Sequence, residues 1–349
     1  MGACENRWTV AKALRFPGDA LQTILVAAPR GDLSTFFSIE CTKRVHTGRC
    51  VTTANALKVQ AFHTTDVTEQ VRATPGWQQQ YRQMSPGYFS GELRCLGLDG
   101  VEVYEERLNT RVEQFFRAPS GSLAFCFDRS ENSLYLLNEQ SRNIWITPEN
   151  YQEVAVVFDQ AFLARHGLDP QRLEGLFMVP LGSGQNALFG SWLSATLTRL
   201  GEEGCPLQGQ ALAEQLLEDC LFILDNASQR LQGVALGRRD EERAIMHRVS
   251  EWAADCPEET LNLLELADVA GVSLRQLQQA FKAFTGMPPA HWLRLRRLNG
   301  ARRDLLRGGG VTVAEVAMRW SFWHLGRFSE SYRQLFKEFP SETLKRCRV

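Results

Sequence analysis

The chain has 349 residues, of which 44% are hydrophobic and 23% charged, and a formal net charge of −1. This length is sufficient for two domains, each with a hydrophobic core of its own. Near-neutral charge taken alone argues against nucleic-acid binding, and no apolar stretch reaches the roughly 18 residues that a membrane-spanning helix needs.

The cysteines indicate a reducing compartment. There are nine, scattered along the chain, and none is paired at C-x-x-C spacing. An odd, scattered set of this kind predicts free thiols in a cytoplasmic protein rather than a disulfide framework.

Residues 1–60 carry no clear signature, and residues 61–182 have the pattern of a β-rich domain. Turn signals such as Asp99-Gly100 separate runs that alternate or are rich in β-branched residues. Many short strands at regular spacing indicate a sandwich or a barrel. The runs are Leu93–Leu98, Val101–Glu105, Val112–Phe116, Leu123–Phe127, Leu134–Leu137, Ile144–Ile146 and Val154–Phe158.

The interior of this β-rich domain is a candidate ligand site. Metal-dependent enzymes built on such folds need clustered histidines, and none of the six histidines lies between Tyr88 and Phe158. No phosphate-binding loop, nucleophile elbow or zinc-ligand spacing occurs elsewhere. We therefore predict no catalytic residue, no metal and no cofactor, that is, a protein that is not an enzyme.

Aromatic residues of the predicted strands are the candidates to line such a pocket, with Arg107 or Arg111 holding an anionic group. Ordinary core packing is the alternative for each aromatic residue. The candidate ligand-binding residues are Arg107, Phe115, Phe125, Phe127, Tyr135 and Trp145.

Helical periodicity replaces the strand pattern in residues 183–230. Two apolar stripes, one from Phe189 and one from Leu212, predict a pair of helices. Such a pair either covers the barrel or pairs with a second chain. The candidate dimerisation residues are Trp192, Leu193, Leu197 and Leu217. Residues 231–243 are polar and contain glycine, and we take them as a linker to a C-terminal domain at 244–349.

The first helix-turn-helix pattern of this C-terminal domain runs from Leu263 to Gly286. Gly271 is placed to end one helix, and Ser273 with Gln276 forms a capping box for the next. The outward face of the second helix carries Arg275, Gln278, Gln279 and Lys282. Arginine reads guanine edges, glutamine reads adenine edges and lysine neutralises phosphate, so this face has the chemistry of a DNA-reading helix. A solvated polar face is the alternative interpretation.

A second helix-turn-helix pattern, from Val311 to Lys337, repeats the first, with Thr312 and Glu315 as its capping box. Between the two motifs, Trp292 to Leu306 predicts a connecting helix with four arginines available on its outside, namely Arg294, Arg296, Arg302 and Arg303. From Ser273 onward there are 15 Lys and Arg against 5 Asp and Glu, so the remainder of the chain is acidic. This asymmetry predicts one basic binding module on an acidic partner domain.

The C-terminal region from Glu251 to Arg348 resembles the DNA-binding domain of the AraC/XylS family of bacterial transcription regulators. The resemblance rests on an A-x-x-x-G-V-S turn from Ala267, an F-K-x-x-x-G-x-x-P run from Phe281 and an R-L-x-x-A run from Arg297. The segments TTDVTEQ…WQQQY and FWHLGRF are similar to the ethanolamine-operon-regulator branch. The family usually has glycine at the positions of Ser321 and Lys337.

The resemblance implies a cupin-like β-sandwich followed by two recognition helices that enter successive major grooves. The fold class is then α+β in two domains: an N-terminal cupin-like sandwich at 61–182 with flanking helices, and a C-terminal all-α tandem helix-turn-helix. Combined with the residue chemistry, it gives the candidate DNA-binding residues Arg275, Gln276, Gln278, Gln279, Lys282, His324, Leu325, Arg327, Ser329 and Glu330. Glu330 is the one acidic residue of this set. Its carboxylate would either accept a hydrogen bond from cytosine N4 or repel the DNA phosphates.

The sequence as a whole predicts a cytoplasmic, nucleoid-associated regulator of transcription that binds double-stranded promoter DNA as a homodimer. A small-molecule effector or partner would act on the N-terminal domain, and an activator would place RNA polymerase nearby. The alternatives are a non-catalytic module that binds another protein and a cupin-like enzyme fused to a DNA anchor.

Overall fold

The computed structural model describes residues 57–74, 76–141, 143–182, 184–203, 209–231, 238–255 and 261–346. Most of the unassigned segment 1–60, and residues 232–237 of the predicted linker, lie outside these ranges. The described residues form a β-rich N-terminal part and an all-helical C-terminal part, which confirms the predicted fold class.

Two antiparallel sheets form the N-terminal part. The larger has seven strands in the order β1-β3-β4-β9-β6-β7-β10, and the smaller has three in the order β2-β5-β8. The seven predicted runs fall in β3 to β9. The strand bounds are β1 Val59–Thr64, β2 Gln78–Gln83, β3 Gly91–Leu98, β4 Val101–Leu108, β5 Val112–Arg117, β6 Leu123–Asp128, β7 Ser133–Leu137, β8 Asn143–Ile146, β9 Tyr151–Phe158 and β10 Leu181–Gly182.

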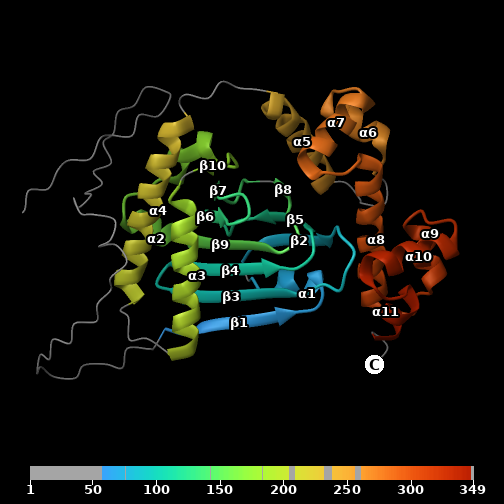
Figure 1. The fold of residues 1–349 in the computed structure, drawn as a ribbon, viewed down its shortest axis with the longest axis horizontal. Helices are drawn as coiled ribbons and strands as arrows, with labels where there is room; N and C mark the ends of the chain where they lie inside the picture. The colour runs from blue at the N-terminus through green and yellow to red at the C-terminus, as the bar shows by residue number, and fades with distance from the viewer. Residues whose placement is uncertain are drawn as a thin grey trace, which may run out of the picture.

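Helices cover the outer face of the seven-stranded sheet, so that the order of layers is helix, sheet, sheet (Figure 1). The apolar stripes of α3 and α4 pack there on outward-facing strand residues such as Phe125, Phe127 and Val156. The N-terminal helices are α1 Val67–Arg72, α2 Gln160–Arg165, a 3-10 helix at Pro170–Leu176, α3 Asn186–Glu203 and α4 Gly209–Leu231.

The inner faces of the two sheets enclose a separate core. Strand side chains alternate between the two faces, so in β6 Ala124, Cys126 and Asp128 point inward while Phe125 and Phe127 point to the helices. On the side of the smaller sheet, Phe116 of β5 and Trp145 of β8 pack against this inner core.

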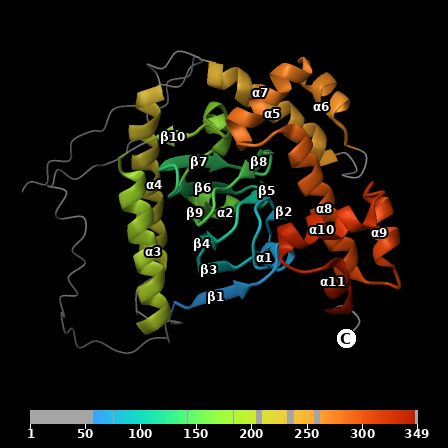
Figure 2. The ribbon, with the colours of Figure 1, turned by 45° about the vertical axis from the view of Figure 1, so that its right-hand side comes forward.

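The C-terminal domain follows the predicted tandem design. Its helices are α5 Arg238–Asp255, α6 Leu263–Ala270, α7 Leu274–Thr285, α8 Pro289–Arg307, α9 Val313–Arg319, α10 Leu325–Phe336 and α11 Pro340–Arg346. Figure 2 shows α6 and α7 at one end of the connecting helix α8, and α9, α10 and α11 at the other. Residues 238–243 of the predicted linker are the start of α5.

The two helix-turn-helix units end their helices in the same backbone conformation with different residues. In the first, Gly271 and Gly286 have φ of 65° and 70°. In the second, Ser321 has φ 62° and Lys337 has φ 61°. This left-handed region disfavours residues with a Cβ, by roughly 1–2 kcal/mol, so both positions where the family usually has glycine carry conformational strain.

We expect Ser321→Gly and Lys337→Gly each to raise the free energy of unfolding by up to about 1 kcal/mol, because glycine adopts positive φ without a steric penalty. Denaturant unfolding of the two variants measures the effect. Ser329→Gly, inside α10, is the matched control and should lower stability by about the same amount. A loss of stability at Ser321 or Lys337 would contradict the assigned backbone strain.

The C-terminal domain docks on the outer face of the three-stranded sheet through α8. The fully buried carboxylate of Glu113 on β5 accepts hydrogen bonds from the Trp292 indole at 2.5 Å and from Arg82 at 3.0 Å. Nε of Arg296 lies 3.6 Å from the same carboxylate, and both arginine side chains are 2% exposed. One carboxylate thus compensates two buried guanidinium groups at the domain interface.

A second set of contacts extends this interface along α8. The side chain of Asn299 pairs with the backbone of Gln83, accepting from its N–H and donating to its carbonyl, each at 2.8 Å. Arg302 forms an ion pair with Asp66 at 2.8 Å. The prediction that Arg296 and Arg302 face outward was wrong. Arg296 lies beside Glu113 of the N-terminal domain, and Arg302 lies between Asp66 of that domain and the Phe336 ring of its own, 4.6 Å from the ring centroid.

Within the described residues, none of the helices is both long enough and apolar enough to cross a membrane.

Candidate functional site

The outward face of α7 presents the predicted polar residues to solvent. Arg275, Gln278, Gln279 and Lys282 are all exposed, whereas Leu277 on the opposite side is completely buried. The helix begins at a capping box in which the side-chain oxygen of Gln276 accepts from the backbone N–H of Ser273 at 3.0 Å. Gln276 is exposed too, but its oxygen is engaged in this cap.

The face of α10 is more mixed. His324, Leu325, Arg327 and Glu330 are exposed, and Ser329 is half-buried. Glu330 places one acidic group on this surface, and its carboxylate accepts a hydrogen bond from the Gln334 side chain at 3.0 Å. The charges of α7 therefore suit DNA better than those of α10.

Two exposed residues near α10 were missed by the sequence reasoning. Trp323, in the turn before the helix, is 75% exposed, and Arg333 lies in the helix with its guanidinium 5.1 Å from the Phe339 ring centroid. Trp323 entered the sequence comparison only within the FWHLGRF run, and its neighbour His324 was the signal that this turn faces solvent. Both residues add to the exposed surface of the second helix-turn-helix unit.

The predicted dimerisation residues pack against other residues of the same chain. Leu193, Leu197 and Leu217 are 2%, 1% and 5% exposed in the core between the helices and the seven-stranded sheet. Trp192 is partly buried against the same core. The apolar stripes of α3 and α4 thus cover the chain's own sheet, and the three leucines are not available to a second copy.

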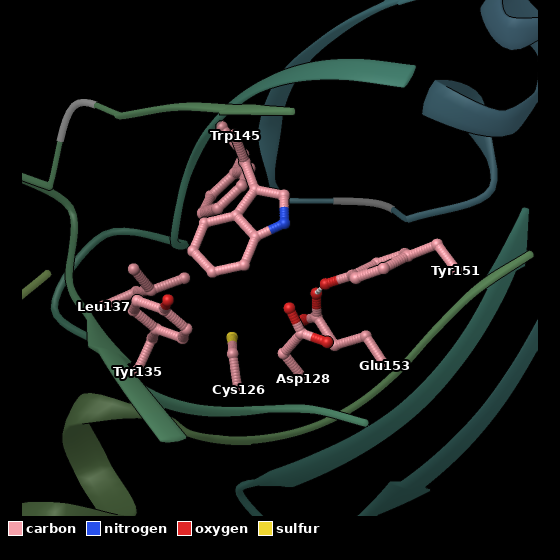
Figure 3. A pocket seen from close by; sticks show the side chains of 8 residues that line it. Cys126, Asp128, Tyr135, Leu137, Trp145, Tyr151 and Glu153 are labelled. Atoms are coloured by element: carbon pink, nitrogen blue, oxygen red, sulfur yellow. Dashed lines mark hydrogen bonds between the residues drawn. The ribbon is translucent and has the colours of Figure 1, made fainter. Parts of the chain in front are cut away.

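The six predicted ligand-binding residues separate into two groups. Tyr135 and Trp145 line a cavity between the two sheets (Figure 3), while the other four lie elsewhere. Phe125 and Phe127 face the helices, and Phe115 packs on the C-terminal core. Strand alternation explains this division, because neighbouring residues of one strand point to opposite faces.

Neither arginine proposed to hold an anion reaches the cavity. Arg107 forms an ion pair with Glu105 at 2.8 Å on the helix-covered face. Arg111 donates to the carbonyl of Thr285 at 3.2 Å, across the domain interface. The eight residues that line the cavity include two acids and no base: Phe116, Cys126, Asp128, Tyr135, Leu137, Trp145, Tyr151 and Glu153. The charge of the site is the reverse of the predicted one.

A helix-turn-helix domain family matches residues 266–346 of the chain. The probable thc operon regulatory protein of Rhodococcus erythropolis is 40% identical over 90 residues, which cover 25% of this chain and 27% of that relative. The XylDLEGF operon transcriptional activator 2 of Pseudomonas putida is 35% identical over 106 residues, 30% of this chain and 68% of that relative.

The chain belongs to the AraC/XylS family. A third relative, the HTH-type transcriptional activator RhaS of an Enterobacter species, is 26% identical over 233 residues, covering 66% of this chain and 78% of that relative. This match extends beyond the DNA-binding domain into the N-terminal half. The ethanolamine-operon-regulator branch of the AraC/XylS family stays a prediction from the sequence.

Proposed function

We propose that the protein is a sequence-specific DNA-binding regulator of transcription whose α7 and α10 enter successive major grooves of promoter DNA. The observation that carries the proposal is the pair of helix-turn-helix units joined by α8, with an exposed face of Arg275, Gln278, Gln279 and Lys282 on α7. Family membership supports it, and the Pseudomonas putida relatives named as activators support an activating role.

We also propose that the N-terminal domain controls DNA binding through a small ligand or a partner. The support is the interface itself, because α8 carries both helix-turn-helix units and is held by Glu113, Gln83 and Asp66 of the N-terminal domain. A change in the three-stranded sheet would therefore reach both recognition helices together.

Arg275→Ala should weaken binding to a cognate site by about 1–3 kcal/mol and relax the preference at one base position, because arginine binds a guanine edge through two hydrogen bonds. Competition binding against cognate and random duplexes measures both effects. Arg172→Ala is the matched control, since it removes an exposed charge from the N-terminal domain. Equal losses on cognate and random DNA would make Arg275 a phosphate contact only.

Selection of sheared genomic DNA by the full-length protein tests the function as a whole. We expect enrichment of a few promoter regions whose half-sites lie about one helical turn apart. Neutralising six phosphates would give a log–log salt slope of roughly −5. Binding that is insensitive to salt would favour the alternative, a module that recognises another protein.

A further inference from the structure

The second helix-turn-helix unit has two exposed apolar residues where its recognition helix begins. Trp323, in the turn, is 75% exposed, and Leu325, the first residue of α10, is 41% exposed. Between them His324 is exposed, and its side chain does not cap the helix. Single exposed apolar side chains are normal on protein surfaces. This pair, however, stands where a helix-turn-helix contacts DNA, because the N-terminal residues of a recognition helix reach the base edges.

The exposed positions of α10 differ in chemistry from those of α7. Both helices have 12 residues, begin with leucine and end at a residue with positive φ, so they align without a gap. In this alignment the long polar side chains of α7 are replaced by shorter or acidic residues: Gly326 for Arg275, Ser329 for Gln278 and Glu330 for Gln279. At these positions α10 therefore lacks the long donors with which α7 would read guanine and adenine.

The start of α10 is open to a close approach by DNA. Gly326 has no side chain, and a Cβ added there would meet no atom within 4 Å. Arg327 is exposed at the next position, and the exposed Arg333 aligns with Lys282 of α7. The helix thus carries positive charge for the phosphates beside its apolar start.

The N-terminal domain holds the opposite end of α10. The backbone N–H of Gly87 and the side chain of Gln83 both donate to the carbonyl of Leu335, at 3.0 Å and 3.1 Å. At 1.5 Å per residue, Leu325 lies about 15 Å along the helix from this contact. The apolar pair therefore stays exposed while the far end of its helix is fixed.

We propose that Trp323 and Leu325 select thymine in the half-site that α10 enters, by packing against the C5-methyl group. Of the four bases, thymine alone presents this methyl in the major groove, and apolar side chains are its usual partners. The contact removes apolar surface of both molecules from water. The first unit then reads its half-site through hydrogen bonds, and the second reads its own through apolar contact. This inference rests on the proposed function and adds the base that the second unit prefers.

Replacement of single thymines by deoxyuridine tests the contact, because deoxyuridine pairs as thymine does and lacks only the methyl group. The probe is a duplex enriched by the genomic selection, in which Arg275→Ala identifies the half-site that α7 reads. At least one replacement in the other half-site should weaken binding about threefold to fivefold, the effect expected when one carbon of this size is no longer buried. Replacements outside both half-sites are the control on the DNA.

Trp323→Gln and Leu325→Gln remove the apolar partners from an exposed surface. Each should weaken binding to the thymine duplex and reduce the effect of deoxyuridine, because the methyl and the side chain act as one contact. Trp323→Phe keeps an apolar ring and should retain the discrimination. Met318→Gln is the matched control, since Met318 is an apolar residue of the same unit, 53% exposed on α9. It should distinguish the two duplexes as the unmodified protein does.

Three results would overturn the proposal: the half-site of α10 contains no thymine, deoxyuridine binds as tightly as thymine throughout it, or both glutamine variants keep the full discrimination. Unchanged DNA affinity of the glutamine variants would instead leave the apolar pair to a protein partner. Selective binding that depends on Arg275 but not on the methyl groups would reject this inference alone. Unselective binding by the unmodified protein would reject the proposed function, and the inference with it.

Discussion

Glu113→Ala is expected to lower the free energy of unfolding by about 3–5 kcal/mol, the usual effect of removing one partner from a buried ion pair. The carboxylate of Glu113 faces Arg82 and Arg296, both 2% exposed, and accepts from the Trp292 indole. Without it, two guanidinium groups are left in the interface with no counter-charge from this position. Denaturant unfolding measures the loss.

Glu149→Ala is the control for Glu113→Ala, because Glu149 is exposed at a turn of the same domain. Glu113→Gln separates charge from shape: it keeps an acceptor for Trp292 and should cost less than the alanine. Should the domains part before they unfold, one transition becomes two and the radius of gyration in X-ray scattering rises. A Glu113→Ala protein as stable as Glu149→Ala would contradict the described interface.

Gly300→Ala is the second substitution with a large expected effect. Gly300 lies in the middle of α8, where alanine normally stabilises a helix by about 1 kcal/mol. Here a Cβ would overlap the six-membered ring of Trp320, which is 6% exposed and donates its indole N–H to Asp304 at 3.0 Å. Overpacking of a buried ring costs about 1–3 kcal/mol, so we expect net destabilisation.

The same substitution should weaken DNA binding, because Trp320 fixes the second helix-turn-helix unit against α8 and a shift there changes the spacing of the recognition helices. Melting temperature and affinity for a cognate duplex are the measurements. Gly326→Ala in α10 is the control for stability, since nothing lies within 4 Å of the added carbon. If Gly300→Ala melts at the same temperature as the unmodified protein, Trp320 does not pack on Gly300 as described.

Local sequence rules were sufficient for strands β3 to β9 and for the exposed polar face of α7, but not for the start of α5, which falls in the predicted linker. The seven predicted strands lie in β3 to β9, and both capping boxes are formed, at Ser273 and at Thr312. These features depend on side chains within a few residues of each other, which a sequence displays directly. The exposure of Arg275 and Lys282 follows from the same periodicity, with Leu277 on the buried side.

The interior of the N-terminal domain required the tertiary structure. In the sequence, Phe125 and Tyr135 are equally good candidates to line a pocket. In the structure they point to opposite faces of one sheet. Three acidic residues, Glu106, Glu153 and Asp128, lie opposite one another on β4, β9 and β6, which are neighbours only in the folded sheet. Strand order sets which charges meet, and the sequence does not display strand order.

The sequence by itself determined the family, the two-part architecture and the chemistry of the first recognition helix, because all three rest on local patterns. Only the tertiary structure decided which arginines of α8 hold the two domains together. Arg296 and Arg302 were predicted to be available on the outside of their helix, yet they are 2% and 8% exposed, and each contacts a carboxylate of the other domain, Glu113 and Asp66 respectively. Periodicity shows which side of a helix avoids its own core, but not what a second domain places on that side.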